Sequence, residues 1–545
     1  MTGSFSWREC PARRLTDLKG RCIWACATRK NMRQATHEVG KALTRLYPDQ
    51  KFRRYIMAKN KKPNPKSLAR KPRGFPDKRE DVLKAELDMI HRVSSVYRLW
   101  GFEGIETGAF EYADALGKFL PDQDRPNAGV FAIQDDDEQW MSLRYDLTAP
   151  LARFAAEHWD TLPKPFRRYA YGPVWRNEKP GPGRFREFMQ CDADTVGAKG
   201  PAADAEMIAM MAEALKAAGA QRFNVRVNTR DLMSGLLDSI DARDEETRLI
   251  ILRALDKLDR LGLSGVADLL GEGREDESGD YTKGAGLDAE RVKRVLAFAE
   301  SGKSSRGETL EALAAVVSGN EAYDRGIAEL REIDGLLSAM GAPDGVVVFD
   351  PTIVRGLEYY TGPVFEGELL DEILDEKGRA VRIGSVGGGG RYDGLVSRFR
   401  NEEIPATGFS LGISRLAAAM SLTGELNALS GPVVVLVLDR EHVADSHVLA
   451  HQLRAAGIRS EVYMGSSGMR PQMKYADRRG APAVVIVGED ERQKGTVTIK
   501  DLIVGAQKAK AIKDNTEWRE SRPGQVEVSR DEMVATIKGM LEADN

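Results

Sequence analysis

The spacing of hydrophobic positions along the chain predicts its first elements. Across residues 77–100 apolar side chains recur every three or four positions, as at Val82, Ile90, Val93 and Tyr97, and this period is typical of an amphipathic helix packed on a core. Shorter runs rich in strand-forming residues follow, and we expect strands at 102–106, 129–133 and 139–144. One long helix followed by sheet is therefore expected near the start of the folded part.

Two longer runs rich in Tyr, Phe and Val lie at 167–175 and 184–194. The loop that separates them, 176–183, contains two prolines and two glycines. Long strands joined by a short polar loop predict an antiparallel hairpin rather than a parallel pair with a crossover helix.

The chain changes character twice more. Residues 234–337 are charged and rich in Ala and Leu, which predicts a helical insertion. Strands are expected again at 346–349 and 364–368, and a helix at 411–422. After a Gly-Pro boundary near 430, strands alternate with helices, and this alternation predicts a small parallel or mixed sheet with crossover helices.

Composition and charge narrow the class of protein. The chain has 545 residues and a formal net charge of −3, so binding to nucleic acid must depend on local basic patches. No apolar run approaches the roughly 20 residues that cross a bilayer, and no signal-peptide core is present. We therefore expect a cytoplasmic protein without membrane contact. The four cysteines lack partners at zinc-finger spacing, and we expect neither a disulfide framework nor a metal site.

One segment differs from this ordinary composition. Residues 51–73 contain ten Lys and Arg and no Asp or Glu, which predicts a disordered basic arm. Such an arm fits contact with RNA phosphates and equally fits a solubilising tail. The residues before Met57 show no periodic pattern, and we expect them to be an upstream extension or not to be translated in the cell.

Two segments that carry arginines suggest binding of a polyphosphate. Arg176 ends a predicted strand, and its planar guanidinium suits bidentate contact with an α-phosphate. Arg415 lies near the start of a predicted helix, whose N-terminus adds positive potential for a triphosphate. Taken singly, each arginine also fits a surface ion pair. The chain has no P-loop pattern, which disfavours that kind of nucleotide site.

Together these segments resemble the motifs of the class II aminoacyl-tRNA synthetases. Residues 172–188 resemble the second motif and 408–415 the third, and 77–110 stand where the first, dimer-forming motif belongs. The resemblance implies an α+β fold: an antiparallel-sheet catalytic domain with a helical insertion, followed by a C-terminal α/β anticodon-binding domain. The regions that we expect are a basic extension at 1–71, the catalytic core at 72–233 and 341–428, the insertion at 234–340 and the anticodon-binding domain at 429–545.

Two further segments, 354–362 and 388–395, resemble the signatures of the histidine-specific members of that class, in a form similar to the alphaproteobacterial branch. Arg355 supplies a fixed cation, while Tyr359 and Tyr360 offer hydroxyls and flat faces to an imidazole. Alone, the first segment also fits a strand end with core aromatics. Together they imply a homodimeric enzyme that activates L-histidine with ATP and transfers it from the adenylate to tRNA(His).

The same resemblance implies a set of site residues. Contacts with histidine are expected from Asp146, Leu147, Thr148, Gln190, Asp194, Tyr359 and Tyr360. Contacts with ATP are expected from Arg176, Glu178, Arg184 and Arg415, and the catalytic cations are expected to be Arg176, Arg355 and Arg415. Because Arg355 stands where relatives hold a metal ion, Mg²⁺ is expected on the ATP phosphates without a site built from protein.

Three features depart from the family pattern. Gly108 stands where the first motif has proline, which would loosen the dimer strand. The loop 177–183, which reads the acceptor end of the tRNA in the family, lacks several of the basic residues found there in many bacterial enzymes. Ser414 replaces the acidic residue that precedes the third-motif arginine, and we expect Arg415 to lose an orienting partner.

A non-enzymatic alternative is the synthetase-like regulatory subunit of ATP phosphoribosyltransferase. Such paralogues lack the anticodon domain and lose the second-motif arginine, whereas this chain keeps Arg176, Arg415 and the C-terminal segment. A class II synthetase for another amino acid is a second alternative, and the two histidine signatures disfavour it.

Overall fold

The computed structural model describes residues 69–115, 129–181, 183–275, 279–354, 360–371, 384–423, 430–504 and 524–543. The predicted basic extension at 1–71 lies almost wholly outside these residues. Within them no helix is both long and apolar enough to span a membrane.

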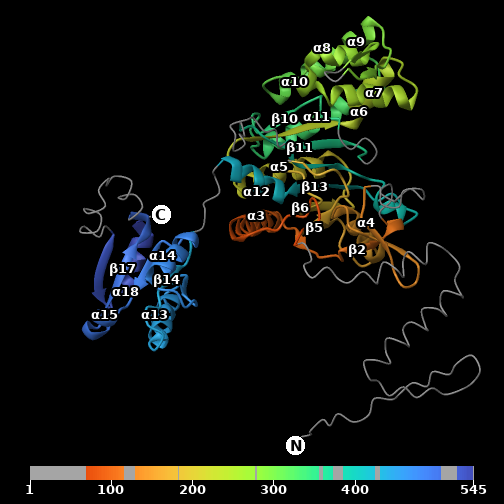
Figure 1. Cartoon of the computed structure of the whole chain (residues 1–545). Coiled ribbons are helices and arrows are strands. Elements are labelled where there is room, and N and C mark those ends of the chain that lie inside the picture. Colours follow the sequence, from red (N-terminus) through yellow and green to blue (C-terminus); the bar gives the residue numbers. More distant parts are fainter. Residues whose placement is uncertain are drawn as a thin grey trace, which may run out of the picture. The chain divides into compact units, whose positions relative to one another are not determined.

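The largest sheet has eight strands in the order β1-β5-β6-β13-β12-β11-β7-β10 (Figure 1). These strands are β1 (Glu103–Gly104), β5 (Phe166–Trp175), β6 (Glu187–Val196), β7 (Phe223–Thr229), β10 (Val347–Phe349), β11 (Pro363–Leu369), β12 (Ser385–Arg391) and β13 (Ala406–Gly412). All pairs from β5 to β7 are antiparallel, whereas β1 and β10 pair in parallel at the two edges. The expected antiparallel sheet is thus found at the centre, and the sheet as a whole is mixed.

Strands β5 and β6 confirm the predicted antiparallel hairpin, with Arg168 opposite Asp194 and Trp175 opposite Glu187. Side chains alternate between the two faces of a strand. On β6, Cys191 and Ala193 face the apolar core. Residues 190, 192 and 194 therefore share the opposite face, which proves to be the face of the candidate site.

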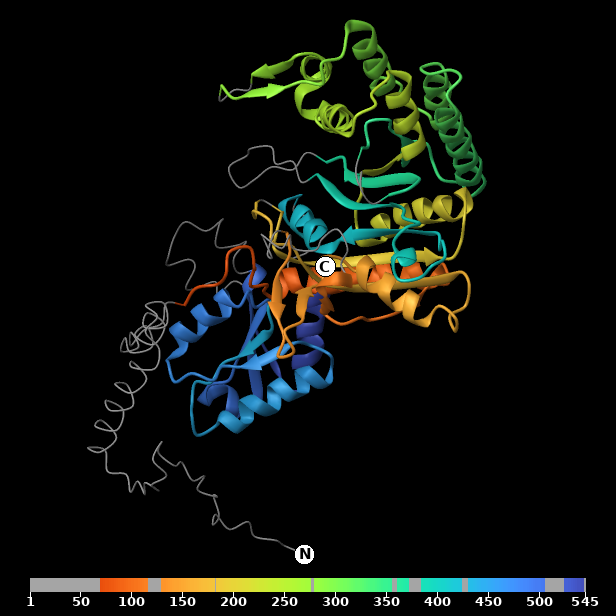
Figure 2. The ribbon, with the colours of Figure 1, turned by 90° about the vertical axis from the view of Figure 1, so that its right-hand side faces the viewer.

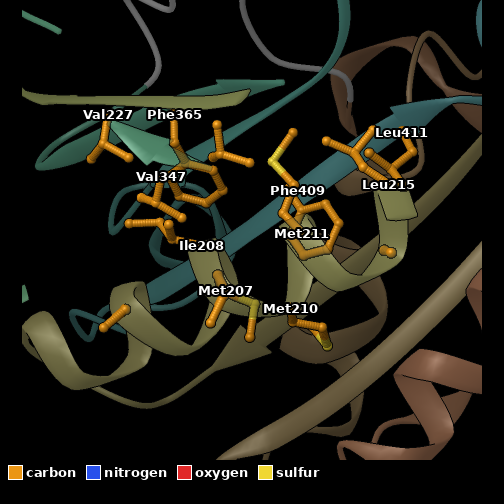
Figure 3. Packing of buried hydrophobic residues seen from close by; sticks show 14 of the residues in the cluster. Met207, Ile208, Met210, Met211, Leu215, Val227, Val347, Phe365, Phe409 and Leu411 are labelled. Carbon is orange, nitrogen blue, oxygen red and sulfur yellow. The ribbon is translucent and has the colours of Figure 1, made fainter. Parts of the chain in front are cut away.

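Two helices, α3 (Glu80–Leu99) and α5 (Pro201–Ala218), cover the apolar face of the sheet. Met211 and Leu215 of α5 lie against Phe409 and Leu411 of β13 (Figure 3). The predicted period of α3 is confirmed on one side only: Met89, Ile90, Val93 and Tyr97 are buried, whereas Val82, Leu83 and Leu87 are exposed. The helix therefore carries an apolar strip that the described chain leaves uncovered.

Smaller elements frame the hairpin. A three-stranded antiparallel sheet has the order β2-β4-β3, from β2 (Phe110–Tyr112), β3 (Ala132–Gln134) and β4 (Trp140–Leu143). Helix α4 (Thr148–His158) follows β4 after a short turn, and helix α12 (Ile413–Thr423) follows β13 directly. A short 3-10 helix, η2 (Val396–Arg398), lies against α4.

The predicted insertion contains six helices among the described residues: α6 (Arg230–Ser239), α7 (Glu245–Leu255), α8 (Leu258–Leu270), α9 (Ala289–Ala299), α10 (Arg306–Ala314) and α11 (Glu321–Ala339). A two-stranded hairpin, β8 (Gly273–Glu275) and β9 (Tyr281–Lys283), joins α8 to α9. Helices α7 and α8 and one side of α9 share an apolar cluster of their own, whereas Leu310, Tyr323 and Leu330 of α10 and α11 join the core of the large sheet. Figure 2 shows these helices in yellow-green and green beside the strands of the sheet. The helical segment thus has two apolar clusters, and α6 and α9 contribute side chains to both.

The C-terminal part has a five-stranded sheet in the order β15-β14-β16-β17-β18. Its elements are β14 (Val433–Val435), α13 (Val443–Ala455), β15 (Ser460–Val462), α14 (Met469–Arg478), β16 (Ala483–Ile486), α15 (Glu489–Lys494), β17 (Thr496–Asp501), β18 (Gln525–Ser529) and α18 (Met533–Ala543). The first three strands in that order are parallel and the last two antiparallel, which confirms the predicted mixed sheet. Gly457 and Gly480 end α13 and α14 at positive φ, where glycine carries no steric penalty.

Candidate functional site

A cavity of about 780 Å³ opens on the face of the large sheet that carries Gln190. Its lining comes from segments far apart in the sequence: the hairpin β5–β6, the turn before α4, the strands β11 to β13 and the start of α12. Of the residues expected at the site, those that line it are Asp146, Thr148, Arg176, Glu178, Arg184, Gln190, Tyr360 and Arg415. Arg355 and Tyr359 lie outside the described residues.

Arg176 presents its guanidinium from the end of β5 between two aromatic rings. The guanidinium carbon lies 4.4 Å from the ring centre of Tyr145 and 5.2 Å from that of Phe188. Its Nε also donates to the Tyr145 carbonyl at 3.3 Å. Cation–π contact on two sides holds a charged, multidentate donor at the cavity wall without neutralising it.

The loop after Arg176 is held together by Glu178. Its carboxylate accepts hydrogen bonds from Arg184 and from the Tyr145 hydroxyl, the latter at 3.0 Å. Burial alone would raise the pKa of Glu178, but these two hydrogen bonds, together with the charges of Arg184 and Arg176, outweigh burial and hold the pKa below its usual value. Arg186 Nε donates to the Glu178 carbonyl at 2.9 Å. Glu178 thus stays ionised and orders a loop that its glycines and prolines leave without regular structure.

Arg415 lies in the first turn of α12. Its Nη1 donates to the Ser385 carbonyl at 2.6 Å, and its Nε lies 3.4 Å from the Gly183 carbonyl. These contacts tie it to β12 and to the hairpin loop, so the guanidinium of Arg415 is held from two sides.

Asp146 stands at the turn before α4. Its Oδ1 accepts from the backbone N–H groups of Thr148 and Ala149, at 3.1 and 2.9 Å. One oxygen thereby caps the helix N-terminus, while the side chain also lines the cavity. Leu147 is different: its buried side chain packs with Ala170 and Val174, away from the cavity lining. If Leu147 contacts histidine as expected, it does so through its backbone and not through its side chain.

Gln190 is buried and lines the cavity, and its Oε1 has no hydrogen-bond partner among the described residues. A buried amide oxygen without a partner is costly and is usually satisfied by a ligand or water. Asp194, two residues further along β6, does not line the cavity. Its Oδ2 pairs with Arg168 at 2.8 Å, and its Oδ1 accepts from the Tyr392 hydroxyl. Asp194 therefore lies one layer beneath the lining, which sequence reasoning did not anticipate.

Glycines on the neighbouring strands leave room for Asp194 beneath the cavity lining. A Cβ on Gly408 would lie 2.0 Å from Asp194 Oδ1, and one on Gly389 would lie 2.4 Å from the Gly408 carbonyl. Strands β12 and β13 can approach each other closely, and Asp194 can occupy its position, only because residues 389 and 408 are glycines without a Cβ. The Arg391 that ends the glycine run turns away from the cavity and pairs with buried Asp204 and with Glu329.

Sequence reasoning also missed Arg168 and Asp192 beneath the cavity. Arg168 is fully buried and is the cation nearest to Asp192 and Asp194. Burial raises the pKa of Asp192 to about 8 even though Arg168 opposes the rise, and burial likewise raises the pKa of Asp194. The two-residue spacing of Gln190, Asp192 and Asp194 on one strand was the available signal. Among the described residues no group of three His, Cys, Asp or Glu is arranged to hold a metal ion.

Comparisons with known proteins assign this architecture to a class. The family model described as histidyl-tRNA synthetase matches residues 74–416, and the one described as anticodon binding domain matches residues 432–540. The mixed sheet with its hairpin cavity is that of a class II synthetase catalytic domain. The chain belongs to the histidyl-tRNA synthetase family.

Individual relatives agree. The histidine–tRNA ligase of Caulobacter vibrioides is 59% identical over 478 residues, which cover 87% of this chain and 97% of that protein. The solved histidyl-tRNA synthetase of Nostoc sp. PCC 7120 has a TM-score of 0.65 at 29% identity, covering 87% of this chain and 99% of that one. A Bacillus halodurans structure described as an ATP phosphoribosyltransferase regulatory subunit/histidyl-tRNA synthetase has a TM-score of 0.58 at 25% identity, covering 75% and 97%. The expected resemblance to the alphaproteobacterial branch is confirmed by the Caulobacter relative.

Proposed function

We propose that the 780 Å³ cavity is where the chain binds ATP and L-histidine and joins them as histidyl-adenylate. The reaction is the ATP-dependent ligation of histidine to tRNA(His), with release of AMP and pyrophosphate. One observation carries the assignment of the site: Arg176 and Gln190 of the hairpin β5–β6 line a single cavity with Arg415, which is distant in the sequence.

The arginines supply the electrostatics. Arg176 is held by an aromatic ring and a backbone carbonyl at the end of β5, which suits an α-phosphate that gains charge during in-line attack by the histidine carboxylate. Arg415, at the N-terminal turn of α12, suits the γ-phosphate. We assign to Arg355 the second contact with the α-phosphate, and Glu178 with Arg184 shapes the loop that covers the nucleotide. Positioning and positive charge provide the rate, so no protein nucleophile takes part.

Other residues of the cavity lining are proposed to bind histidine. The unpartnered Oε1 of Gln190 and the carboxylate of Asp146 are acceptors for the substrate ammonium, with Thr148 beside them. Tyr360 lines the cavity, and we propose that Tyr359 and Tyr360 bracket the imidazole. Asp194 fixes the floor beneath the ring through Tyr392. A polar pocket of this kind rejects apolar analogues because its buried groups would be left unpaired.

We propose that Mg²⁺ enters the site on the ATP phosphates. Mg²⁺ prefers oxygen ligands and keeps much of its water, so one or two carboxylates suffice. Glu178 and Glu366 line the cavity and are the residues that would contact it. When bound, the ion neutralises phosphate charge; orientation of the reacting groups remains with the arginines.

A homodimer is the proposed assembly. Large apolar side chains stay exposed on α3 and on the three-stranded sheet, namely Val82, Leu83, Leu87, Phe110, Tyr112, Ile133 and Trp140. Exposed apolar surface of this kind is typical of protein–protein contact. Leu87→Glu is expected to shift sedimentation from dimer to monomer, and unchanged sedimentation would contradict this interface. The cytoplasmic location stays a prediction from the sequence.

The regulatory-subunit alternative is disfavoured because the anticodon binding domain matches residues 432–540 and Arg176 and Arg415 line the cavity. ATP–pyrophosphate exchange with each amino acid separates the possibilities. We expect exchange with histidine alone. Exchange with another amino acid would indicate a different synthetase, and no exchange at all would indicate the regulator.

A further inference from the structure

We infer that Glu86 of α3 and Lys78, with Ser414 of α12, form a buried junction that positions Arg415 and Gln190 for substrate binding. Ser414 Oγ donates to Glu86 Oε1 at 2.7 Å, and Lys78 Nζ contacts Glu86 Oε2 at 2.7 Å. Lys78 Nζ also donates to Ser414 Oγ at 3.2 Å. The inference rests on the proposed function of the cavity.

The junction is buried and fully hydrogen-bonded. Glu86 and Ser414 are each 3% exposed. Ser414 Oγ accepts one further hydrogen bond, from the backbone N–H of Met189 at 2.9 Å. Both carboxylate oxygens of Glu86 are therefore hydrogen-bonded, and the Ser414 hydroxyl uses its one donor and both of its acceptor positions. A buried charged network of this kind is stable only in one arrangement, because each missing partner leaves a buried polar group unpaired.

The junction reaches the cavity through two neighbouring residues. Ser414 directly precedes Arg415, and Met189 directly precedes Gln190, so hydrogen bonds at 414 and 189 fix the backbone from which both cavity side chains project. Helix α12 packs on α3 and on β6, which brings the three elements together around Glu86. Glu86 and Lys78 touch neither cavity residue and act as positioning residues.

This arrangement bears on one expectation from the sequence. A serine at position 414 was expected to leave Arg415 without an orienting acid. An acid does lie next to position 414, but it comes from α3, 328 residues earlier in the chain, and it bonds Ser414 rather than Arg415. Leu83 and Leu87 are exposed on α3, the helix that also carries Glu86, so a second copy packed against α3 would lie close to this junction.

Glu86→Gln and Ser414→Ala test the junction. Each removes a charge-assisted hydrogen bond, and we expect the KM values for ATP and histidine in pyrophosphate exchange to rise about tenfold. A purely structural role would instead lower kcat through loss of active enzyme and leave both KM values unchanged. Asp88→Asn is the matched control, because it breaks a pair on the same helix, with Lys84, that is exposed to solvent.

The relocation variant Glu86→Ala/Ser414→Glu returns a carboxylate to the junction from α12, within reach of Lys78. We expect it to recover both KM values, whereas Glu86→Ala alone does not. Hydrogen exchange at the Met189 amide gives a readout independent of activity, and we expect it to speed up in Ser414→Ala. Wild-type KM values in Glu86→Gln and Ser414→Ala, or an unchanged Met189 amide, would overturn the inference. A wild-type enzyme without exchange would overturn the proposed function instead, and the amide readout would still test the junction.

Discussion

The buried pair of Arg168 and Asp194 beneath the cavity gives a prediction whose size follows from the structure. Arg168 is 0% exposed and Asp194 2% exposed, and their atoms lie 2.8 Å apart. Arg168→Met removes the cation and leaves the carboxyl buried without its charge partner. Breaking a buried pair from one side costs about 3–5 kcal/mol, a large part of the roughly 5–15 kcal/mol that stabilise a domain. The Leu147 carbonyl also loses the 2.9 Å hydrogen bond that it accepts from Arg168.

The loss should depend on pH. Burial already raises the pKa of Asp194 above its unfolded value of 3.8, so the folded state holds its proton more tightly and stability falls as pH rises above that value. Without Arg168 the folded pKa rises further. The destabilisation by Arg168→Met is therefore expected to be larger at pH 8.5 than at pH 6, as measured by urea unfolding followed by intrinsic fluorescence.

The double variant Arg168→Met/Asp194→Asn is the control. It removes both charges, so the double-mutant cycle should give a coupling of about 2 kcal/mol or more, with the double variant more stable than Arg168→Met alone. Additive losses, or a cost below about 1 kcal/mol for Arg168→Met, would refute the reasoning that this pair is interdependent.

Three further predictions concern single positions. Burial raises the pKa of Asp192 from 3.8 to about 8, so between these values the folded state keeps a proton that the unfolded state has lost, and stability falls as pH rises; Asp192→Asn should flatten this fall between pH 5 and pH 8, and an unaltered pH profile would argue against it. Gly408→Ala should destabilise by about 1–3 kcal/mol or more, since the new Cβ would strike Asp194, whereas Gly335→Ala, with open space around it, should be neutral or stabilising in the same thermal melts. Arg355→Ala should abolish adenylate formation with little change in unfolding; activation of histidine at near wild-type rate would make Arg355 structural.

Local rules predicted part of the secondary structure. The hairpin β5–β6 follows from two Tyr- and Phe-rich runs around a Gly/Pro loop, and the buried side of α3 follows from its three-to-four spacing. The C-terminal elements β17, β18 and α18 were not predicted individually, because the sequence indicated only an alternation of strands and helices after the Gly-Pro boundary. The membership of Arg176, Gln190 and Arg415 in one cavity depended on the family resemblance, since no local pattern brings residues 176 and 415 together.

The sequence does not show which side chains reach the cavity lining and which lie beneath it. Asp194 was expected in contact with histidine, yet its alternation with Gln190 says only which face it shares, and the missing side chain of Gly408 lets it sink beneath the lining. The side chain of Leu147 likewise packs in an apolar cluster. Packing between strands, and not the spacing of residues along one strand, decides which side chain reaches the cavity. The partner of Ser414 lies on another helix, and neither residue signals the other in the sequence.

The rate of histidine-dependent ATP–pyrophosphate exchange in Arg176→Ala tests the central claim most directly. We expect a loss of about 10³-fold or more, since a held cation on the reacting phosphate is removed, while folding is kept. Arg243→Ala, at a side chain that is 86% exposed, should exchange like the wild type. Exchange by Arg176→Ala at a rate near wild type would contradict the placement of adenylation in this cavity.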